Sequence, residues 1–443
     1  MTYAEAVARL TALRGGEHAG IRPGLERIEG LLAALGHPES RYAIVQVGGT
    51  NGKGSVAAML ATILKAAGRR VGLYTSPHLV SFRERIRVDA EAIGEDAVVD
   101  GVEALGTLVA RFDATMFEAT TALALDHFAR EAVDVAVLEV GLGGRLDATT
   151  VGRPVAVILS RIDLDHEAVL GSTVEAIAVD KACIVRAGVA YSAAQAPEAA
   201  RVIVARAEAT GVPLLMEGRD LSVRVEFRDL GGQRIACEGP GFSLTSLHLP
   251  LLGTYQPGNA LLAVAAAHGL GAGEAAVRAG LARARWPGRF QVVRGTPTLV
   301  LDAAHNPAGA RALADSLRAY FPDRPLTLVL GVSRDKDAAA MLAALAPLAR
   351  RLILTRAATA RAAEPETLRA LLPAGGAGAE AVSSVAEALD LATRSAETPV
   401  VCVAGSLFVV GEALTHLGGT EAACLIENGA DSMGSLEGAR DTS

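Results

Sequence analysis

A glycine-rich segment that carries one lysine and one serine is the part of this sequence best suited to chemistry. It lies between the apolar run Ala43–Val47 and the alanine-rich stretch Val56–Ala67, and it comprises Gly48, Gly49, Thr50, Asn51, Gly52, Lys53, Gly54 and Ser55. Glycines allow backbone N–H groups to close around phosphate oxygens, and the start of a helix attracts negative charge. We expect Lys53 to reach the β- and γ-phosphates, and the Ser55 hydroxyl to bind a phosphate or a metal ion. Val47 stands where the common phosphate loop has its first glycine, but strand, loop and helix together predict nucleotide binding.

A second candidate is the acid that ends the apolar run Val135–Glu139. A buried strand that ends in a carboxylate is typical of the strand that holds Mg²⁺ beside a nucleoside triphosphate. Alone, Glu139 would be interpreted as a solvent-facing acid, but beside a phosphate loop the metal role is the better interpretation. The glycine-rich segment Gly141–Asp147 follows directly, at the kind of strand end where α/β proteins bind ligands.

These residues need a scaffold that brings several strand ends together. Short runs rich in β-branched residues alternate with helical stretches such as Val56–Ala67 and Thr120–Ala129, and the runs are Ala43–Val47, Val71–Tyr74, Val135–Glu139 and Val155–Ser160. This alternation predicts a parallel sheet covered by helices on both faces. The predicted fold class is therefore α/β, with a parallel sheet of the P-loop NTPase type.

The rest of the sequence divides into further parts. Polar and apolar residues alternate around Gly231 and Gly232, so Leu221–Leu252 is predicted to form a small antiparallel appendage. A second strand-and-helix series follows the segment Arg285–Gln291, with strands expected at Leu299–Asp302, Leu326–Val332, Arg351–Thr355 and Val400–Ala404. We therefore expect an ATP-binding domain over residues 1–285, a smaller Rossmann-like domain over 286–420 and a disordered tail over 421–443.

The composition excludes several classes of protein. The chain has 443 residues and a formal net charge of −7, which gives it no basic footprint for nucleic acid. It contains no uninterrupted apolar run of about 18 residues, so no membrane span is expected. The cysteines are scattered and the N-terminus lacks an apolar signal core, so we expect a cytoplasmic monomer that acts on small molecules.

A series of motifs runs in one order along nearly the whole chain. They are GLERI from Gly24, GTNGKGS from Gly49, YTSPHL from Tyr74, ERI from Glu84, FE from Phe117, EVGLGGRLDAT from Glu139, LDH from Leu164, DKA from Asp180, YQPGNA from Tyr255, GRFQ from Gly288, LDAAHNP from Leu301 and AGSLFVVGE from Ala404. In these motifs the chain resembles the folylpolyglutamate synthase/dihydrofolate synthase family, within the Mur ligase superfamily.

The resemblance implies a P-loop ATPase domain followed by a smaller Rossmann-like domain, and it implies a reaction. ATP would phosphorylate a carboxylate of the acceptor, and the amine of L-glutamate would displace phosphate from the acyl phosphate to form an amide. The acceptor would be dihydropteroate in dihydrofolate synthesis and the γ-carboxylate of a reduced folate in polyglutamate synthesis. A carboxylate resists amines until one oxygen becomes a leaving group, and lysine and metal ions would stabilise the charge that develops on the phosphoryl group.

The resemblance also assigns roles to residues. Two magnesium ions are implied, with Ser76, Glu139 and His166 as ligands. Lys181 matches the family lysine that is carbamylated, which would make it a carboxylate-like metal ligand; the alternative is an ordinary charge on a helix surface. The expected catalytic residues are Lys53, Lys181 and His305. The nucleotide would be bound by Asn51, Gly52, Lys53, Gly54, Ser55, Asn259, Arg289 and Asp302, the acceptor by Thr115, Met116, Phe117, Glu118, Leu146, Asp147 and Ala148, and the incoming glutamate by His305 and Ser406.

The chain departs from the family pattern at a few positions, which are Gly48 for alanine, Ala303 for glycine, Thr150 for asparagine, Asp180 for glutamate and Cys183 for glycine. The last two flank Lys181, so its carbamylation depends most heavily on the resemblance. Only four of the 42 basic residues are lysines, and Lys53 and Lys181 are two of them. Because lysine and arginine do different chemistry, their retention favours roles that need a primary amine.

Alternative functions stay open at this point. One is a cell-wall Mur ligase acting on a UDP-sugar peptide, which the match to the pterin-binding segments disfavours. Another is an enzyme with folylpolyglutamate synthase activity only. A third is a catalytically silent nucleotide-binding protein, which is disfavoured because the chain retains Lys53, Glu139, His166, Lys181 and His305.

Overall fold

The computed structural model describes residues 1–14, 24–372, 378–394 and 398–418. The chain divides into two compact units, unit 1 over Met1–Trp286 and unit 2 over Pro287–Ser443. This division falls within the segment Arg285–Gln291, where the sequence places a boundary. The disordered tail expected over 421–443 lies outside the described residues.

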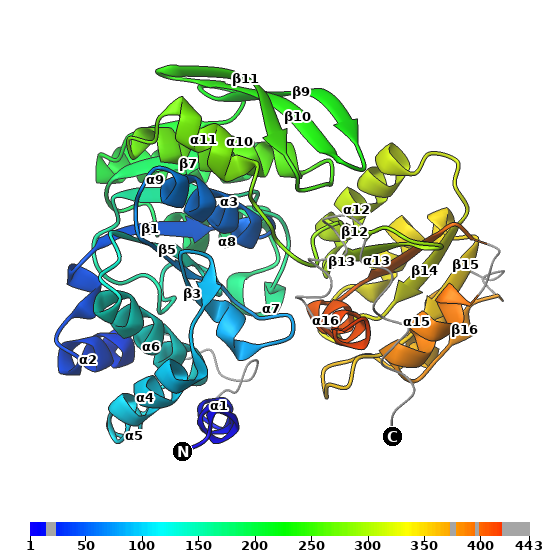
Figure 1. Ribbon diagram of the computed structural model, residues 1–443, viewed down its shortest axis with the longest axis horizontal. Helices are drawn as coiled ribbons and strands as arrows, with labels where there is room; N and C mark the ends of the chain where they lie inside the picture. The colour runs from blue at the N-terminus through cyan, green and yellow to red at the C-terminus, as the bar shows by residue number, and fades with distance from the viewer. Residues whose placement is uncertain (15–23, 373–377, 395–397, 419–443) are drawn as a thin grey trace, which may run out of the picture. The chain divides into compact units, whose positions relative to one another are not determined.

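Unit 1 is built around an eight-stranded sheet, most of which is parallel (Figure 1). Its order is β4 (Glu91–Ala92), β3 (Ile86–Val88), β2 (Val71–Tyr74), β5 (Val135–Glu139), β1 (Ala43–Gly48), β6 (Ala156–Leu159), β7 (Val189–Ser192) and β8 (Leu214–Met216). Strands β3 and β4 pair antiparallel at one edge. The strands predicted from the apolar runs are β1, β2, β5 and β6, and they are neighbours at the centre of the sheet. The predicted α/β fold class is confirmed.

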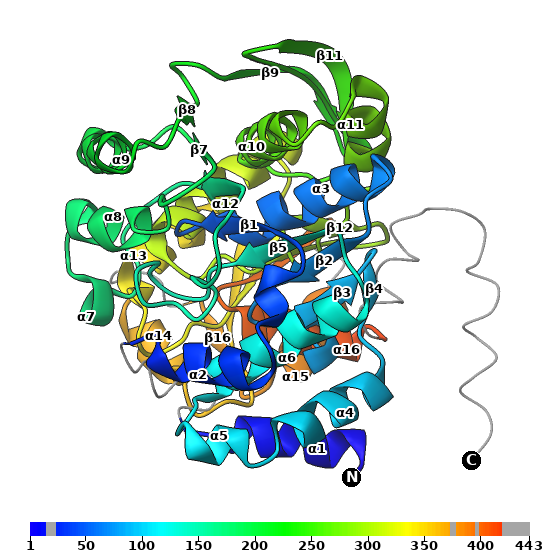
Figure 2. The same ribbon diagram turned by 90° about the vertical axis from the view of Figure 1, so that its left-hand side faces the viewer.

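Helices cover both faces of this sheet, as predicted (Figures 1 and 2). Side chains alternate along β1, so Val45 and Val47 pack in one apolar core and Ile44 packs in another. The first core includes α3 (Lys53–Ala66), α10 (Gln256–Gly269) and α11 (Glu274–Leu281). The opposite face is covered by α1 (Tyr3–Thr11), α2 (Glu26–Ala34), α4 (Glu95–Leu105) and α6 (Met116–Arg130), and farther along by α8 (Val174–Ala182) and α9 (Pro197–Thr210). Two one-turn helices, α5 (Leu108–Arg111) and α7 (Glu167–Leu170), lie in connections.

Two helices begin earlier than the alanine-rich stretches predict. Helix α3 starts at Lys53, because the phosphate-loop residues themselves form its first turn after Gly52 in the left-handed region. Helix α6 starts at Met116, because Thr115 and Glu118 form a reciprocal capping box. Apolar periodicity does not mark such starts, since Gly52 has no side chain and the capping residues of α6 are polar.

The antiparallel appendage predicted over Leu221–Leu252 is present. It consists of β9 (Ser222–Asp229), β10 (Gly232–Gly239) and β11 (Phe242–Leu249), in the order β11-β10-β9. Ile235 of β10 and Leu247 of β11 are fully buried and pack in the same core as α10 and α11. The appendage therefore belongs to unit 1.

Unit 2 is a second α/β unit, as the sequence predicts. Its sheet has the order β12 (Gln291–Val293), β13 (Thr298–Asp302), β17 (Val400–Ala404), β14 (Leu326–Leu330), β15 (Arg351–Leu354) and β16 (Glu380–Ala381). Among the described strands of this sheet, β12 pairs antiparallel with β13 and the other pairs are parallel. The helices are α12 (Pro307–Tyr320), α13 (Ala338–Leu345), α14 (Pro365–Ala370), α15 (Val385–Thr393) and α16 (Leu407–His416).

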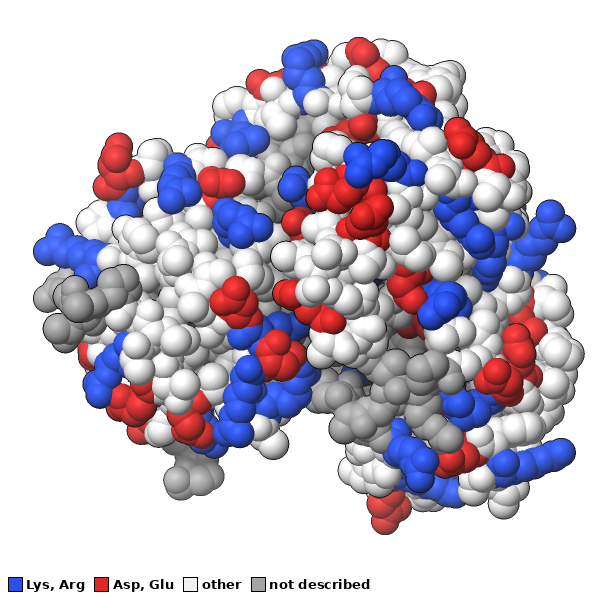
Figure 3. All heavy atoms as spheres, turned by 180° about the vertical axis from the view of Figure 1, so that it is seen from behind, with Lys and Arg blue, Asp and Glu red and all other residues white. Residues whose placement is uncertain are grey.

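The surface carries charges of both signs. On the face drawn in Figure 3, Lys and Arg side chains are interspersed with Asp and Glu side chains. Among the described residues, no helix combines the length and apolarity that crossing a bilayer requires.

Candidate active site

The carboxyl edge of the unit 1 sheet gathers the residues expected to bind nucleotide and metal. Strands β2, β5, β1 and β6 are neighbours, and the register pairs Val47 of β1 with Glu139 of β5. Ser76 follows β2, the phosphate loop follows β1, and the segment that leads to His166 follows β6. Parallel strands end at the same edge of a sheet, and this is the edge at which α/β proteins bind ligands.

Close contacts with other segments require the glycines of the phosphate loop. Gly49 has a φ of +130°, and a Cβ there would lie 2.9 Å from the carbonyl oxygen of Ser160. Gly52 has a φ of +96°, and a Cβ there would lie 2.4 Å from Oδ1 of Asn259. A Cβ at Gly54 would lie 2.9 Å from the indole of Trp286. The loop therefore rests against three separate segments: the one that follows β6, helix α10 and the last residue of unit 1.

The start of α10 also holds the loop by hydrogen bonds. Nδ2 of Asn259 donates to Oε1 of Gln256 at 3.0 Å, and Nε2 of Gln256 donates to Oγ of Ser55 at 3.2 Å. Gln256 is fully buried. A hydroxyl that accepts from an amide keeps its own hydrogen and a second lone pair for a phosphate or a metal ion. Sequence reasoning anticipated Asn259 but missed Gln256, whose partner lies 201 residues away.

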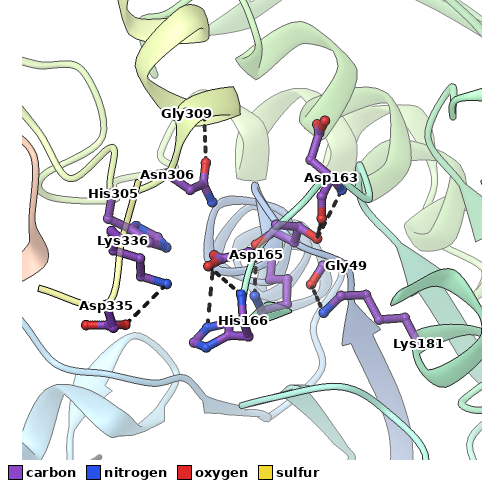
Figure 4. Close-up of polar contacts among 12 residues, drawn as sticks. Gly49, Asp163, Asp165, His166, Lys181, His305, Asn306, Gly309, Asp335 and Lys336 are labelled. Carbon is purple, nitrogen blue, oxygen red and sulfur yellow. Dashed lines mark hydrogen bonds and ion pairs between the residues drawn. The ribbon is translucent and has the colours of Figure 1, made fainter. Parts of the chain in front are cut away.

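Two lysines donate to carbonyl oxygens of the loop. Nζ of Lys53 donates to the Thr50 oxygen at 3.1 Å, and Nζ of Lys181 donates to the Gly49 oxygen at 2.9 Å (Figure 4). Lys181 is only 4% exposed, so its interpretation as a charge on a helix surface is wrong. Burial, and after it the nearby charge of Lys53, lowers the pKa of Lys181 to about 7. Its amine is therefore available in the unprotonated form near neutral pH.

Some departures from the family pattern lie around Lys181 and make contacts of their own. Oδ1 of Asp180 accepts the backbone N–H of Arg145 at 3.3 Å, and Sγ of Cys183 donates to the oxygen of Val179 at 3.3 Å. A Cβ at Gly48 would lie 2.6 Å from Cδ1 of Ile184. Glycine therefore suits the packing of Ile184 against the start of the phosphate loop.

Two of the expected metal ligands are in contact. The backbone N–H of Ser76 donates to Oε2 of Glu139 at 3.2 Å. His166 follows Asp165, whose Oδ1 accepts the His166 backbone N–H at 2.8 Å (Figure 4). No three His, Cys, Asp or Glu side chains in the described part of the chain are grouped to hold a metal ion by themselves. Mg²⁺ needs few protein ligands, because it retains waters and binds phosphate oxygens. The Ser76 hydroxyl and the Glu139 carboxylate, at the same sheet edge as the phosphate loop, therefore fit a magnesium site.

The segment Thr115–Glu118 forms the start of α6. Oε2 of Glu118 accepts from the backbone N–H of Thr115 at 2.8 Å, and Nε of Arg27 donates to both Glu118 oxygens at 3.0 and 3.1 Å. Both carboxylate oxygens of Glu118 are therefore engaged in holding the helix start. Arg27 lies in the GLERI motif, and its role in bracing this segment was not predicted.

The two segments expected to bind the acceptor come together in unit 1. A Cβ at Gly141 would lie 2.5 Å from Cζ of Phe117, so the Phe117 ring packs directly on the loop that contains Asp147. Leu146 is 38% exposed, whereas Met116 and Ala148 are buried. Burial raises the pKa of Asp147, and hydrogen bonds from Thr149 and Leu142 oppose this rise.

In unit 2, the residues expected to bind glutamate lie at the carboxyl edge of the sheet. The register aligns Asp302 of β13 with Ala404 of β17, and Ala404 with Leu330 of β14. His305 follows β13 and Ser406 follows β17, so the two residues lie at one edge. Oγ of Ser406 caps α16 by accepting the N–H of Phe408 at 3.2 Å.

Hydrogen bonds orient Asp302, Arg289 and His305 in this part of unit 2. Oδ2 of Asp302 accepts the N–H of Phe290 at 2.8 Å, which ties β13 to the GRFQ segment. Nη1 of Arg289 donates to the Gly288 oxygen at 3.1 Å. Nδ1 of His305 lies 2.9 Å from the Ala303 oxygen, and because a carbonyl only accepts, Nδ1 carries a hydrogen. Lys336, drawn in Figure 4 with Asp335, has a side chain that is only 8% exposed.

Two family descriptions match the chain. The Mur ligase middle domain matches residues 47–267, and the Mur ligase glutamate ligase domain matches residues 288–407. The two matches fall in unit 1 and unit 2 respectively.

Curated relatives match over most of the chain. A probable bifunctional folylpolyglutamate synthase/dihydropteroate synthase of Haloferax volcanii is 40% identical, over 94% of this chain and 50% of the relative. A dihydrofolate synthase/folylpolyglutamate synthase of Mycobacterium tuberculosis is 37% identical, over 90% of this chain and 87% of the relative. The chain thus spans about half the length of the archaeal relatives it matches, at 50% and 55%.

Solved structures share the fold. FolC of Escherichia coli, in complex with DHPP and ADP, superposes with a TM-score of 0.85 at 33% sequence identity. The match covers 94% of this chain and 98% of that chain.

Proposed function

The chain belongs to the folylpolyglutamate synthase/dihydrofolate synthase family of Mur ligases, and on that premise we propose that it is an ATP-dependent ligase for L-glutamate. It joins glutamate to dihydropteroate and to the γ-carboxylate of reduced folates, in each case through an acyl phosphate. The proposal rests on two lysine amines that donate hydrogen bonds to the same phosphate loop. Lys53 donates to the Thr50 oxygen, and the buried Lys181 donates to the Gly49 oxygen.

In the first step, the acceptor carboxylate attacks the γ-phosphorus of ATP, and ADP leaves. The phosphate loop binds the phosphates through its backbone N–H groups and the first turn of α3. Lys53, whose ammonium lies at this loop, stabilises the negative charge that develops on the transferred phosphoryl group. Ser76, Glu139 and His166 would hold Mg²⁺, which supplies further neutralisation of phosphate charge when bound.

Lys181 is proposed to be carbamylated. The reaction joins the unprotonated Nζ to the carbon of CO₂ and releases one proton, which produces a carbamate with two oxygens. Burial and the neighbouring Lys53 charge support it, because both favour an unprotonated amine before the reaction, and the Lys53 charge also stabilises an anionic group after it. The product would be an additional oxygen ligand for a second magnesium ion.

In the second step, the amine of glutamate attacks the acyl carbon, and phosphate leaves. His305 and Ser406 are proposed to bind this glutamate, and the His305 imidazole is proposed to accept a proton from its ammonium group. Arg289 and Asp302 are proposed to contact the nucleotide, with the guanidinium at phosphates and the carboxylate at the ribose. The acceptor is proposed to lie along Thr115–Glu118 and Leu146–Ala148.

Phosphate release with defined acceptors tests the proposed function. With Mg-ATP and L-glutamate present, purified protein should release phosphate only when dihydropteroate or a reduced folate is added. Turnover with a reduced folate but not with dihydropteroate would restrict the activity to polyglutamate synthesis. Turnover only with a UDP-sugar peptide would identify a cell-wall ligase, and no turnover with any acceptor would favour a silent nucleotide-binding protein. The monomeric state and the cytoplasmic location stay predictions.

Gly54→Ala is expected to weaken binding of Mg-ADP by about tenfold, since the added methyl group would overpack against the rigid Trp286 indole. Isothermal titration calorimetry measures the affinity. The emission of Trp286, which is the single tryptophan of the chain, should shift as the indole is displaced. Gly94→Ala is the matched control, because a Cβ at Gly94 meets no atom within 4 Å. An unchanged affinity in Gly54→Ala would contradict the assigned position of the nucleotide phosphates.

A further inference from the structure

Gln46 is a buried glutamine in the middle of β1. It is fully buried, and the register places it between Leu138 of β5 and Val157 of β6. Ile44, which points to the same face of the sheet, lies in the apolar core beneath α2 and α6. An amide in such surroundings is unfavourable unless it makes hydrogen bonds, so its partners indicate why it is there.

Both partners of Gln46 belong to the loop that follows β5. Nε2 of Gln46 donates to Oγ1 of Thr150 at 2.8 Å and to Oγ1 of Thr149 at 3.3 Å. Oγ1 of Thr149 in turn donates to Oδ1 of Asp147 at 2.5 Å, and Oγ1 of Thr150 donates to the Gly144 oxygen at 2.7 Å. Each hydroxyl hydrogen is therefore in use, and each hydroxyl oxygen can only accept from Gln46. An amide nitrogen serves both because it carries two hydrogens.

The other end of the amide supports this orientation. In the described structure, Oε1 of Gln46 is buried and has no hydrogen-bond partner. Reversing the amide would place Oε1 against two hydroxyl oxygens whose hydrogens are already donated elsewhere. The loop therefore fixes the orientation of Gln46, at the cost of one unsatisfied oxygen.

We propose that Gln46 is a positioning residue for binding of the acceptor. Through Thr149 it aligns the carboxylate of Asp147, and through Thr150 it holds the backbone at Gly144. Because β1 continues into the phosphate loop, one strand then sets the positions of both the acceptor loop and the ATP phosphates. This inference rests on the proposed function, in which the Leu146–Ala148 segment contacts the acceptor.

Gln46→Met tests the proposal, because methionine is of similar size and has no N–H donor. We expect the KM for the acceptor to rise by at least about tenfold, while the KM for ATP stays within about twofold of wild type. Steady-state phosphate release measures both constants, and circular dichroism verifies that the variant is folded. An acceptor KM within about twofold of wild type would overturn the proposal.

Gln233→Met is the matched control. Gln233 is also a buried strand glutamine, its Nε2 donates to the oxygens of Leu251 and Gly253 at 2.9 and 3.1 Å, and its Oε1 also has no partner. Its replacement removes the same number of side-chain hydrogen bonds from unit 1 without touching the Asp147 loop. The acceptor KM should therefore be unchanged, and an equal rise in Gln233→Met would show a general packing effect and overturn the proposal.

A second pair of variants decides the question if Gln46→Met does not fold. Thr149→Val removes the hydroxyl that links Gln46 to Asp147 and should raise the acceptor KM, whereas Thr149→Ser keeps the hydroxyl and should restore it. Equal acceptor KM values for these two variants would overturn the proposal. If wild-type protein shows no acceptor-dependent turnover, the proposed function is wrong, and this inference fails with it. If wild-type protein turns over but the variants keep the wild-type acceptor KM, only the Gln46 inference is wrong.

Discussion

Lys53→Ala protein is expected to release phosphate at least about a hundredfold more slowly than wild type at saturating ATP, glutamate and acceptor. The Lys53 ammonium lies at the phosphate loop, where its Nζ donates to the Thr50 oxygen. Its charge is needed most when the phosphoryl group is in transit, so kcat should fall more than the affinity for ATP. Steady-state phosphate release and a binding titration with Mg-ADP separate the two effects.

Lys65→Ala is the control for this prediction. Lys65 lies near the end of the same helix, and its exposed amine donates to the Asp89 oxygen at 2.6 Å. We expect its kcat to stay within about twofold of wild type, since exposed lysine contacts of this kind contribute little. A Lys53→Ala protein that keeps more than about a tenth of wild-type kcat would show that the lysine of the loop is not needed for phosphoryl transfer.

Lys181→Arg protein is expected to release phosphate at least about a hundredfold more slowly than wild type. A guanidinium forms no stable carbamate, and a cation that is always charged would replace a group that is proposed to become an anion beside Lys53. Lys181→Ala should be equally inactive, but acetate or propionate should restore part of its activity by filling the space of the carbamate. Lys65→Arg serves as the control for arginine substitution as such. Full activity of Lys181→Arg would contradict carbamylation.

The same proposal predicts a dependence on dissolved CO₂ and on pH. Wild-type protein depleted of CO₂ should be poorly active, and bicarbonate should restore its activity. Only the unprotonated amine reacts, and the pKa of Lys181 is about 7, so more than half of the amines are reactive above that pH and fewer below it. Reactivation should therefore be faster at pH 8 than at pH 6, and native mass spectrometry should detect one added CO₂ on the wild-type chain alone. A reactivation rate independent of pH would contradict the assigned amine.

The sequence predicts the scaffold of the site well, and the reason lies in the strands. Val71–Tyr74 and Val135–Glu139 are buried on both faces, so their apolar runs coincide with the strands of the structure. Once the strands are known to be parallel, their carboxyl ends must meet, and the residues that follow β1 and β5 must lie together. Side-chain chemistry at strand ends is thus predictable without knowledge of any particular contact.

Contacts between distant parts of the chain were not predictable in this way. Gln256 supports Ser55 across 201 residues, and Gln46 supports the Asp147 loop across 103 and 104 residues. No local pattern marks such pairs, because a buried glutamine in a strand or at a helix start looks like any other polar residue. The burial of Lys181 was not predictable either, because a lysine near the end of a helix is usually solvated.

The contacts of the phosphate loop have a consequence for how this unit is synthesised. Gly49 lies early in the chain, yet it packs against Ser160, Gly52 packs against Asn259, and Gly54 packs against Trp286, the last residue of unit 1. On the ribosome, the loop emerges long before two of these three supports exist. Nascent chains that stop before α10 would carry the complete GTNGKGS motif without Asn259 and Trp286. We therefore expect the motif, which is among the first parts of the unit to be made, to bind nucleotide only after these supports have been made.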